Sequence, residues 1–492
     1  MTSSILRANS HLLALGNEAQ QNAGIRRENV TASLPVLPQQ RKKRSNRAGE
    51  ATLQSHQSNA PHPSLPSENP TPLHVCANAR AGGVRRRHLR SLGLHIRHPR
   101  GPQVPAPNAS PLRTLALAGR SRERVAAALS WAASPGPVPH VPILVADTSD
   151  PASLAVVIAR ARVLLSCAGP FRLHGRQVAA ACAAAGAHCL DISGEPEFME
   201  RVEADLHELA AKNGSLIVSA CGFASTVADL GFLFHSRQWT PPSVPVSMVA
   251  YVNLESSDRK IVGNFATFES AVLGVANTSQ LQELRRSRPR PAKPSIPGPL
   301  PPKGSLMIEH EKALGLWAMK LPSADTVVVK RTLAKVTEHP KGLPCVDETS
   351  DFEKHRKEFW SSIKPAHFGV KIGSQRPDQQ KRRSAAPRSK HGSSAVATSI
   401  RPTHQSVEAS QIRRLSPGVS GPEIGYITTS IILVQCALVL LSQRANLPKG
   451  GVYTPGVVFG PTDLQKRLEE NGLSFDLIST RTIPSDEQAH AS

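Results

Sequence analysis

Charged and polar residues follow four apolar runs of this 492-residue chain, each close to the point where the run ends. The four clusters are Arg120 and Ser121, then Asp147, then Cys167, Gly169 and Pro170, and finally Asp191, Ser193 and Glu195. In a parallel α/β sheet, residues at the carboxyl ends of the strands lie along one crevice and contact the ligand. The clusters therefore predict one ligand site along such an edge.

The first cluster predicts which dinucleotide this site prefers. An acidic residue at the end of the second strand binds the ribose hydroxyls of NAD, whereas an arginine there accepts the extra phosphate of NADP. Arg120, with Ser121 beside it, therefore indicates NADP. Asp147, at the end of the third strand, would meet the adenine, and the backbone of the third cluster would line the nicotinamide. An arginine that only caps an exposed turn is the alternative.

The fourth cluster supplies the candidate catalytic residues Asp191, Ser193 and Glu195, which would face the substrate. Glu195 could donate a proton only if burial raised the pKa of its carboxyl group. We favour a structural role for Glu195, as a carboxylate stabilised by a helix N-terminus. Asp229 lies in the first turn of a predicted helix and could have the same structural role. No combination of His, Lys and Tyr marks a general acid.

Apolar runs that alternate with helical patterns position these clusters. Runs at 114–118, 141–146, 163–167, 190–192 and 216–218 read as strands, and 122–133, 153–160, 177–185, 196–212 and 227–234 read as helices. Apolar strands that alternate with helices predict a parallel sheet covered by helices on both faces. The fold class is therefore α/β.

The net charge of +22 is concentrated in three segments. Residues 1–110 hold fifteen Lys or Arg and four acidic residues. Residues 285–303 hold six Lys or Arg and no acidic residue, and residues 374–414 hold nine Lys or Arg and two acidic residues. Because 1–110 and 374–414 are also rich in Pro, Ser or Gln and show no sustained period, we expect them to be disordered. The basic segments lack interleaved aromatic residues, so the charge predicts no nucleic-acid partner.

Neither a metal site nor a membrane span is predicted. The seven cysteines show no CxxC or Cys/His ligand spacing and read as buried reduced thiols. The most apolar run, 427–441, is shorter than the ~20 residues that span a bilayer and contains Ser430 and Gln435, so it predicts a buried helix. The amino-terminal stretch has no evident cleavage site, which argues against secretion and leaves a mitochondrial presequence open.

The middle of the chain predicts a second, α+β domain. Residues 247–252 and 327–329 read as strands, and 351–360 read as a charged helix. Residues 285–303 read as a proline-rich basic linker.

Several linked motifs resemble those of the saccharopine dehydrogenase-like oxidoreductases. They are residues 118–121, 167–171 with Gly175, 191–196, 222–231, 265–271, 421–426, 434–435, 440–441 and 450–456. The resemblance implies a Rossmann domain that binds NAD(P), a second α+β domain and a carboxyl-terminal return. It also implies a reductase with a small-molecule or lipid substrate, linked to lipid droplets, membranes and glycolipid metabolism. A cytoplasmic, lipid-droplet or mitochondrial location follows, and a homo-oligomer is left open.

The sequence departs from this family at its start. Family members begin with an apolar strand and a glycine-rich loop whose backbone approaches the pyrophosphate at a helix N-terminus. No segment matches that pattern, since Gly82 and Gly83 are followed by Val84 and three arginines. We therefore expect an incomplete Rossmann-type sheet without its central strand, poor folding, and weak or no binding of NADP or NAD. The alternatives are a non-catalytic scaffold at lipid droplets or membranes, and a natural amino terminus that differs from residues 1–110.

These expectations divide the chain into five segments. They are a disordered basic leader (1–110), a Rossmann-type NAD(P)-binding domain (111–240), a second α+β domain (241–373), a low-complexity basic insert (374–414) and a carboxyl-terminal return (415–492).

Overall fold

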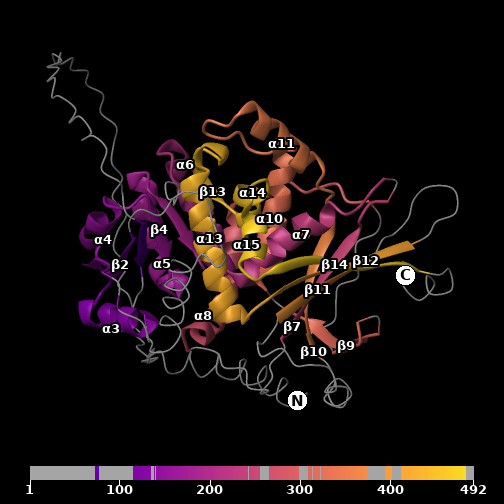
Figure 1. Cartoon of the computed structure of the whole chain (residues 1–492), viewed down its shortest axis with the longest axis horizontal. Coiled ribbons are helices and arrows are strands. Elements are labelled where there is room, and N and C mark those ends of the chain that lie inside the picture. Colours follow the sequence, from indigo (N-terminus) through magenta and orange to yellow (C-terminus); the bar gives the residue numbers. More distant parts are fainter. Residues whose placement is uncertain are drawn as a thin grey trace, which may run out of the picture. The chain divides into compact units, whose positions relative to one another are not determined.

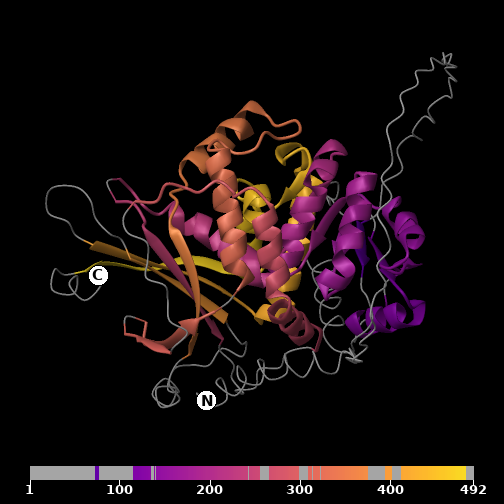
Figure 2. The same cartoon turned by 180° about the vertical axis from the view of Figure 1, so that it is seen from behind.

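The structure, a computed structural model, describes residues 73–76, 115–133, 138, 140–241, 243–254, 265–297, 308–312, 314–321, 323–374, 394–401 and 412–483 (Figure 1). All of them belong to one compact unit, Thr71–Ser492, which contains two seven-stranded sheets (Figures 1 and 2). Most of the leader and of the basic insert lies outside the described residues. The structure therefore tests the expected disorder of these two segments only where it describes strands within them.

The first sheet is parallel throughout. Its strands are β1 (Leu73–Cys76), β2 (Leu115–Gly119), β3 (Ile143–Val145), β4 (Val163–Ser166), β5 (His188–Asp191), β6 (Leu216–Val218) and β13 (Gly451–Tyr453). They lie in the order β13-β6-β5-β4-β1-β2-β3. The five strands predicted between residues 114 and 218 are confirmed to within about two residues.

The central strand is present, so our expectation of its loss is wrong. Strand β1 pairs with β2 on one side, where Val75 lies opposite Leu117, and with β4 on the other, where Val75 lies opposite Leu165. Strands β2 and β4 therefore have no unpaired edge between them. The sequence signal was missed because the strand is short, contains His74 and is not followed by the glycine-rich loop.

Helices pack on both faces of this sheet, as predicted. They are α3 (Arg122–Ala133), α4 (Pro151–Ile158), α5 (Phe171–Ala185), α6 (Pro196–Lys212), α7 (Ala228–Ser236) and α13 (Thr429–Ser442). Successive residues of β4 reach opposite faces, because Val163 and Leu165 belong to the apolar cluster of α3 and α13 and Leu164 to that of α4, α5 and α6. The sheet is thus buried on both sides.

The second sheet is mixed. Its strands are β7 (Ser247–Leu254), β8 (Glu309–Glu311), β9 (Leu316–Lys320), β10 (His367–Ser374), β11 (Ser394–Arg401), β12 (Ile412–Gly421) and β14 (Ser474–Ile483), in the order β14-β12-β11-β7-β10-β9-β8. Only β7 and β10 pair in parallel. Strand β11 lies inside the expected basic insert, so that insert is not disordered throughout: its 394–401 portion pairs with β7 and β12.

The remaining helices are α8 (Phe265–Ala276), α9 (Thr278–Ser287), α10 (Ala324–Glu338), α11 (Ser350–Ser361), α14 (Pro455–Phe459) and α15 (Leu464–Glu470). The strand predicted at 327–329 is wrong, because these residues belong to α10. Ser323 caps that helix, and Val328, Val329, Thr332 and Leu333 are buried along one side of it. The predicted strand at 247–252 and helix at 351–360 are confirmed.

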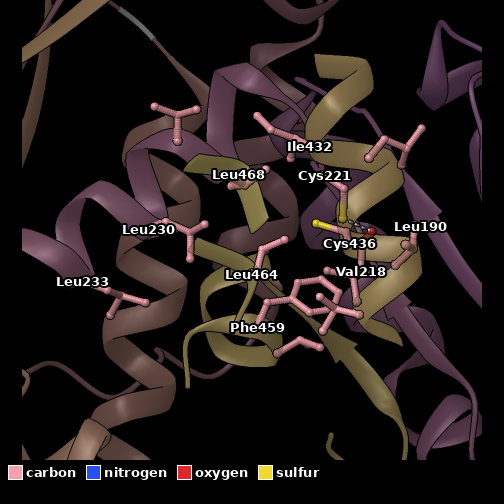
Figure 3. Packing of buried hydrophobic residues seen from close by; sticks show 14 of the residues in the cluster. Leu190, Val218, Cys221, Leu230, Leu233, Ile432, Cys436, Phe459, Leu464 and Leu468 are labelled. Atoms are coloured by element: carbon pink, nitrogen blue, oxygen red, sulfur yellow. Dashed lines mark hydrogen bonds between the residues drawn. The ribbon is translucent and has the colours of Figure 1, made fainter. Parts of the chain in front are cut away.

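The most apolar run forms α13, a helix of the protein core, as predicted. Figure 3 shows Ile432 and Cys436 of α13 against Leu190 of β5, Val218 of β6 and Cys221, which follows β6. The 18-residue window Gly425–Ser442 is long and apolar enough to cross a membrane, but 72% of it is buried inside the protein. We therefore describe it as a core helix.

The carboxyl-terminal segment returns to both sheets, as the resemblance implies. Strand β13 pairs with β6 at the edge of the first sheet, and β14 pairs with β12 at the edge of the second. The two sheets are thereby joined by the same stretch of chain.

Candidate functional site

The carboxyl ends of β2, β3, β4 and β5 lie at one edge of the first sheet, because all four strands are parallel. Each predicted site residue ends one of these strands, follows it directly or lies in the loop after it. The structure nevertheless separates the residues into two groups, one beyond β2 and β3 and the other beyond β4 and β5. This separation is the one expected if a ligand extends along the edge.

Arg120 and Asp147 form the first group. Nη1 of Arg120 lies 3.8 Å from Oδ2 of Asp147, and the side chain of Arg120 is 32% exposed. The other carboxylate oxygen of Asp147 accepts hydrogen bonds from the backbone N–H and the hydroxyl of Ser149. The N–H bond is the largest cause that lowers the pKa of Asp147, and Arg120 contributes less. Arg120 therefore has a loose, solvent-accessible partner.

Ser121, predicted to lie beside the cofactor, caps helix α3. Its Oγ accepts a hydrogen bond from the backbone N–H of Arg124 at 3.2 Å and donates one to Glu123 at 2.7 Å. The next residue, Arg122, is exposed. The end of β2 is consequently a basic turn in which Arg120 and Arg122 carry the charge.

Glu195 caps a helix, but not the one that its position in the sequence suggests. It precedes α6, whereas its carboxylate accepts hydrogen bonds from the backbone N–H groups of Phe171, at 2.8 Å, and Arg172, at 2.9 Å, in the first turn of α5. Glu195 is only 5% exposed to solvent. Both carboxylate oxygens of Glu195 are thus occupied by N–H donors of α5.

Asp191 and Ser193 shape the loop that carries Glu195. Oδ1 of Asp191 accepts hydrogen bonds from the backbone N–H groups of Ser193 and Ala220, and Oγ of Ser193 accepts one from the N–H of Glu195. Burial raises the pKa of Asp191 to about 6, although these hydrogen bonds act in the opposite direction. Neither side chain lines the cavity described next.

A cavity of about 580 Å³ lies beyond β4 and β5, in the size range of small-molecule sites. Cys167, Gly169 and Glu195 from the predicted clusters line it, while Pro170 precedes α5 beside it. Helices α8 and α9 form the opposite wall, and Ser323 and Ala324 at the start of α10 complete it. The cavity is therefore built from the first sheet and from helices that follow β7.

Phe198 and Arg172 are among the cavity residues that sequence reasoning missed. Phe198 packs against Phe171 with 5.6 Å between ring centroids, and a Cβ at Gly175 would lie 2.7 Å from its ring, so Gly175 leaves the space that the ring fills. Arg172 also lines the cavity, and its Nη2 donates to Gln280 of α9 at 2.6 Å. The position of Arg172 next to Phe171, the last residue of the 167–171 motif, was the available signal.

The two groups fit the two ends of a nicotinamide dinucleotide. The basic turn at Arg120 suits a phosphate on the adenosine ribose, and the apolar cavity beside Cys167 and Gly169 suits a nicotinamide ring. The N-terminus of α5 is occupied by Glu195 and offers no place for a phosphate.

A family model described as the saccharopine dehydrogenase NADP binding domain matches residues 108–218. This range includes both groups of site residues and strands β2 to β6, but not β1.

Three relatives match most of the chain. The protein named "Probable mitochondrial saccharopine dehydrogenase-like oxidoreductase" of Arabidopsis thaliana is 48% identical over 464 residues, which covers 84% of this chain and 98% of that protein. The saccharopine dehydrogenase-like oxidoreductase of Bos taurus is 30% identical, with 77% and 94% covered. The "Lipid droplet localized protein" of Caenorhabditis elegans is 29% identical, with 74% and 92% covered.

Proposed function

Since the chain belongs to the saccharopine dehydrogenase-like oxidoreductase family, we propose that it is an NADP-dependent oxidoreductase that acts on a lipid-like small molecule. The observation that carries the cofactor preference is Arg120 at the end of β2, held loosely by Asp147 and accessible to solvent. An arginine at this position accepts the 2′-phosphate that distinguishes NADP from NAD.

The residues of the chain divide the work of binding. Arg120 holds the 2′-phosphate, and Asp147, whose Oδ2 is not used by Ser149, accepts from the adenine amino group. The backbone of Cys167 and Gly169 borders the nicotinamide. When bound as NADPH, the reduced nicotinamide would supply a hydride to the substrate. Glu195 keeps the amino-terminal turn of α5 in place, because both of its oxygens accept N–H groups there.

The affinity for the dinucleotide should be low. No glycine occurs among the five residues that follow Cys76, whereas the family's loop brings several backbone N–H donors to the pyrophosphate. Charge at Arg120 alone does not replace that set of donors. We therefore expect NADPH to bind weakly but more tightly than NADH.

A lipid-like substrate agrees with the cavity and with one relative. The wall contains Phe171, Ile192, Phe198, Val275 and Leu281. The Caenorhabditis elegans relative is named for lipid droplets and the Arabidopsis thaliana relative for mitochondria. We propose that this chain works at the surface of one of these lipid-bounded compartments.

Fluorescence titration of the purified chain with NADPH and NADH tests the proposed function. Tighter binding of NADPH, and oxidation of NADPH in the presence of a lipid aldehyde or enone, are the expected results. A chain that binds neither dinucleotide would instead be the non-catalytic scaffold of the family.

A further inference from the structure

The cavity beyond β4 and β5 is apolar along most of its wall but contains one basic side chain. Arg172 lines it, and the side chain of Arg172 is only 14% exposed. A guanidinium group in such surroundings needs partners for its five N–H donors. The partners of Arg172 therefore decide what the cavity can bind.

Arg172 has few partners for a side chain so nearly enclosed. Its Nη2 donates to Oε1 of Gln280 at 2.6 Å and lies 4.0 Å from Oε2 of Glu197. Within the described part of the chain, Nε and Nη1 have no hydrogen-bond partner. Two sides of the guanidinium group remain available to a ligand.

The neighbouring carboxylates do not neutralise Arg172 completely. Oε1 of Glu197 lies 2.5 Å from Nε of Arg201, so the charge of Glu197 is shared and Arg201 is its closer partner. The carboxylate of Glu195 is held by two N–H groups at the start of α5. An acidic group in the cavity would find in Arg172 a partner that is partly desolvated, where charge-assisted hydrogen bonds are strong.

We propose that this cavity binds an amphiphile whose carboxylate contacts Arg172 and whose hydrocarbon chain lies against Phe171, Phe198 and the α8–α9 wall. Because it names the substrate class, this inference rests on the proposed function. The volume of about 580 Å³ accommodates a medium-length acyl chain, since sites of 300 to 1,000 Å³ enclose ligands of drug size. The polar and apolar parts of the ligand thus have separate partners.

Calorimetric titration of the full chain with decanoate, decan-1-ol and acetate tests the proposal without any dinucleotide. Decanoate should bind, decan-1-ol should bind about tenfold more weakly because it lacks the charge, and acetate should not bind detectably. Equal affinity for decanoate and decan-1-ol, or no binding of decanoate, would overturn the assignment.

Two variants separate a ligand contact from a structural role of Arg172. Arg172→Met should weaken decanoate about tenfold and leave decan-1-ol unchanged. Gln280→Ala removes the same hydrogen bond between α5 and α9 but keeps the guanidinium group, so it should bind decanoate normally. If Gln280→Ala loses as much affinity as Arg172→Met, Arg172 only fastens α9 and the proposal fails.

A second pair of variants locates the ligand. Gly274 of α8 lines the cavity and has no atom within 4 Å of an added Cβ, so Gly274→Trp should fill the cavity and abolish binding of decanoate and decan-1-ol. Val156→Trp changes a residue that is 64% exposed on α4 and should have no effect. Decanoate binding that survives in Gly274→Trp would place the ligand elsewhere. Failure of NADPH to bind while decanoate binds would contradict the proposed function alone.

Discussion

The carboxylate of Glu195 accepts a hydrogen bond from the backbone N–H of Phe171 at 2.8 Å, although the two residues are 24 positions apart. Glu195 lies at the start of α6 and Phe171 at the start of α5, so one side chain fixes the relative position of two helix termini. Both residues line the cavity. The capping bond therefore joins the stability of the first domain to the shape of its site.

Replacing Glu195 should destabilise the protein. Glu195→Ala leaves the buried N–H of Phe171 and the partly buried N–H of Arg172 without an acceptor, and should lower the free energy of unfolding by about 1–3 kcal/mol. Glu195→Gln keeps one acceptor oxygen and should lose less. Urea unfolding measures both changes. Glu208→Ala, at an exposed position within α6, is the control and should change stability little. Equal stability of Glu195→Ala and wild type would refute the capping role.

Asp229 should make stability fall as the pH rises. Its carboxylate accepts from Thr332, at 2.9 Å, and from the N–H of Gly456, at 2.7 Å, while burial raises its pKa from 3.8 to about 7. Between about pH 4 and 7 the folded protein keeps a proton that the unfolded chain releases, so this group stabilises the fold less as the pH increases. Above about pH 7 its effect is constant.

Comparison with Asp229→Asn isolates this effect. Burial lowers the pKa of His188 and His235 to about 3, so these two groups make the free energy of unfolding rise with pH up to about 6.5. The wild type and Asp229→Asn share both histidines, so this trend cancels in the difference between their free energies of unfolding. Between pH 4 and 7 the wild type should lose up to about 1.4 kcal/mol per pH unit relative to the variant. Urea unfolding at several pH values gives both curves; parallel curves would show that Asp229 titrates normally.

Two glycine-to-alanine changes should have opposite effects. A Cβ at Gly456 would lie 2.5 Å from Oδ2 of Asp229, so Gly456→Ala forces the buried contact between α7 and α14 apart and should cost about 1–3 kcal/mol. A Cβ at Gly274 meets no atom within 4 Å, so Gly274→Ala should stabilise α8 by about 0.5–1 kcal/mol. Thermal unfolding of the two variants checks the direction; destabilisation of both would contradict the packing described here.

The described unit should need residues 73–76 and not the residues before Thr71. A chain that begins at Thr71 keeps β1 and should unfold cooperatively at nearly the temperature of the full chain. A chain that begins at Ala77 lacks β1, which leaves β2 and β4 with unpaired inner edges, and should give no cooperative transition. Calorimetric melting distinguishes them, and similar curves would show that β1 does not stabilise the sheet.

The sequence predicted strands β2 to β6 of the first sheet because they are continuous apolar runs separated by helical periods, as for 163–167 and 216–218. The same reasoning failed where local preference and tertiary structure disagree. Val327, Val328 and Val329 favour a strand by type, but Ser323 caps a helix whose buried positions include Val328 and Thr332. The structure therefore follows capping and burial rather than the preference of the valines.

The site could be predicted only in part. The positions of Arg120 and Asp147 follow from strand ends, and their proximity, at 3.8 Å, follows from the parallel pairing of β2 and β3. The partner of Glu195 in α5 and the wall formed by α8 and α9 depend on contacts between residues far apart in the chain. No period or motif in the sequence contains that information.

The affinity ratio for NADPH and NADH, measured by fluorescence titration of wild type and Arg120→Asp, tests the central proposal most directly. We predict that the wild type binds NADPH more tightly, and that Arg120→Asp narrows or reverses this preference because an acidic residue repels the 2′-phosphate and accepts from ribose hydroxyls. Arg122→Asp, at the exposed first residue of α3, should narrow the preference less than Arg120→Asp does. Equal affinities for NADPH and NADH in the wild type, unchanged in Arg120→Asp, would contradict the account.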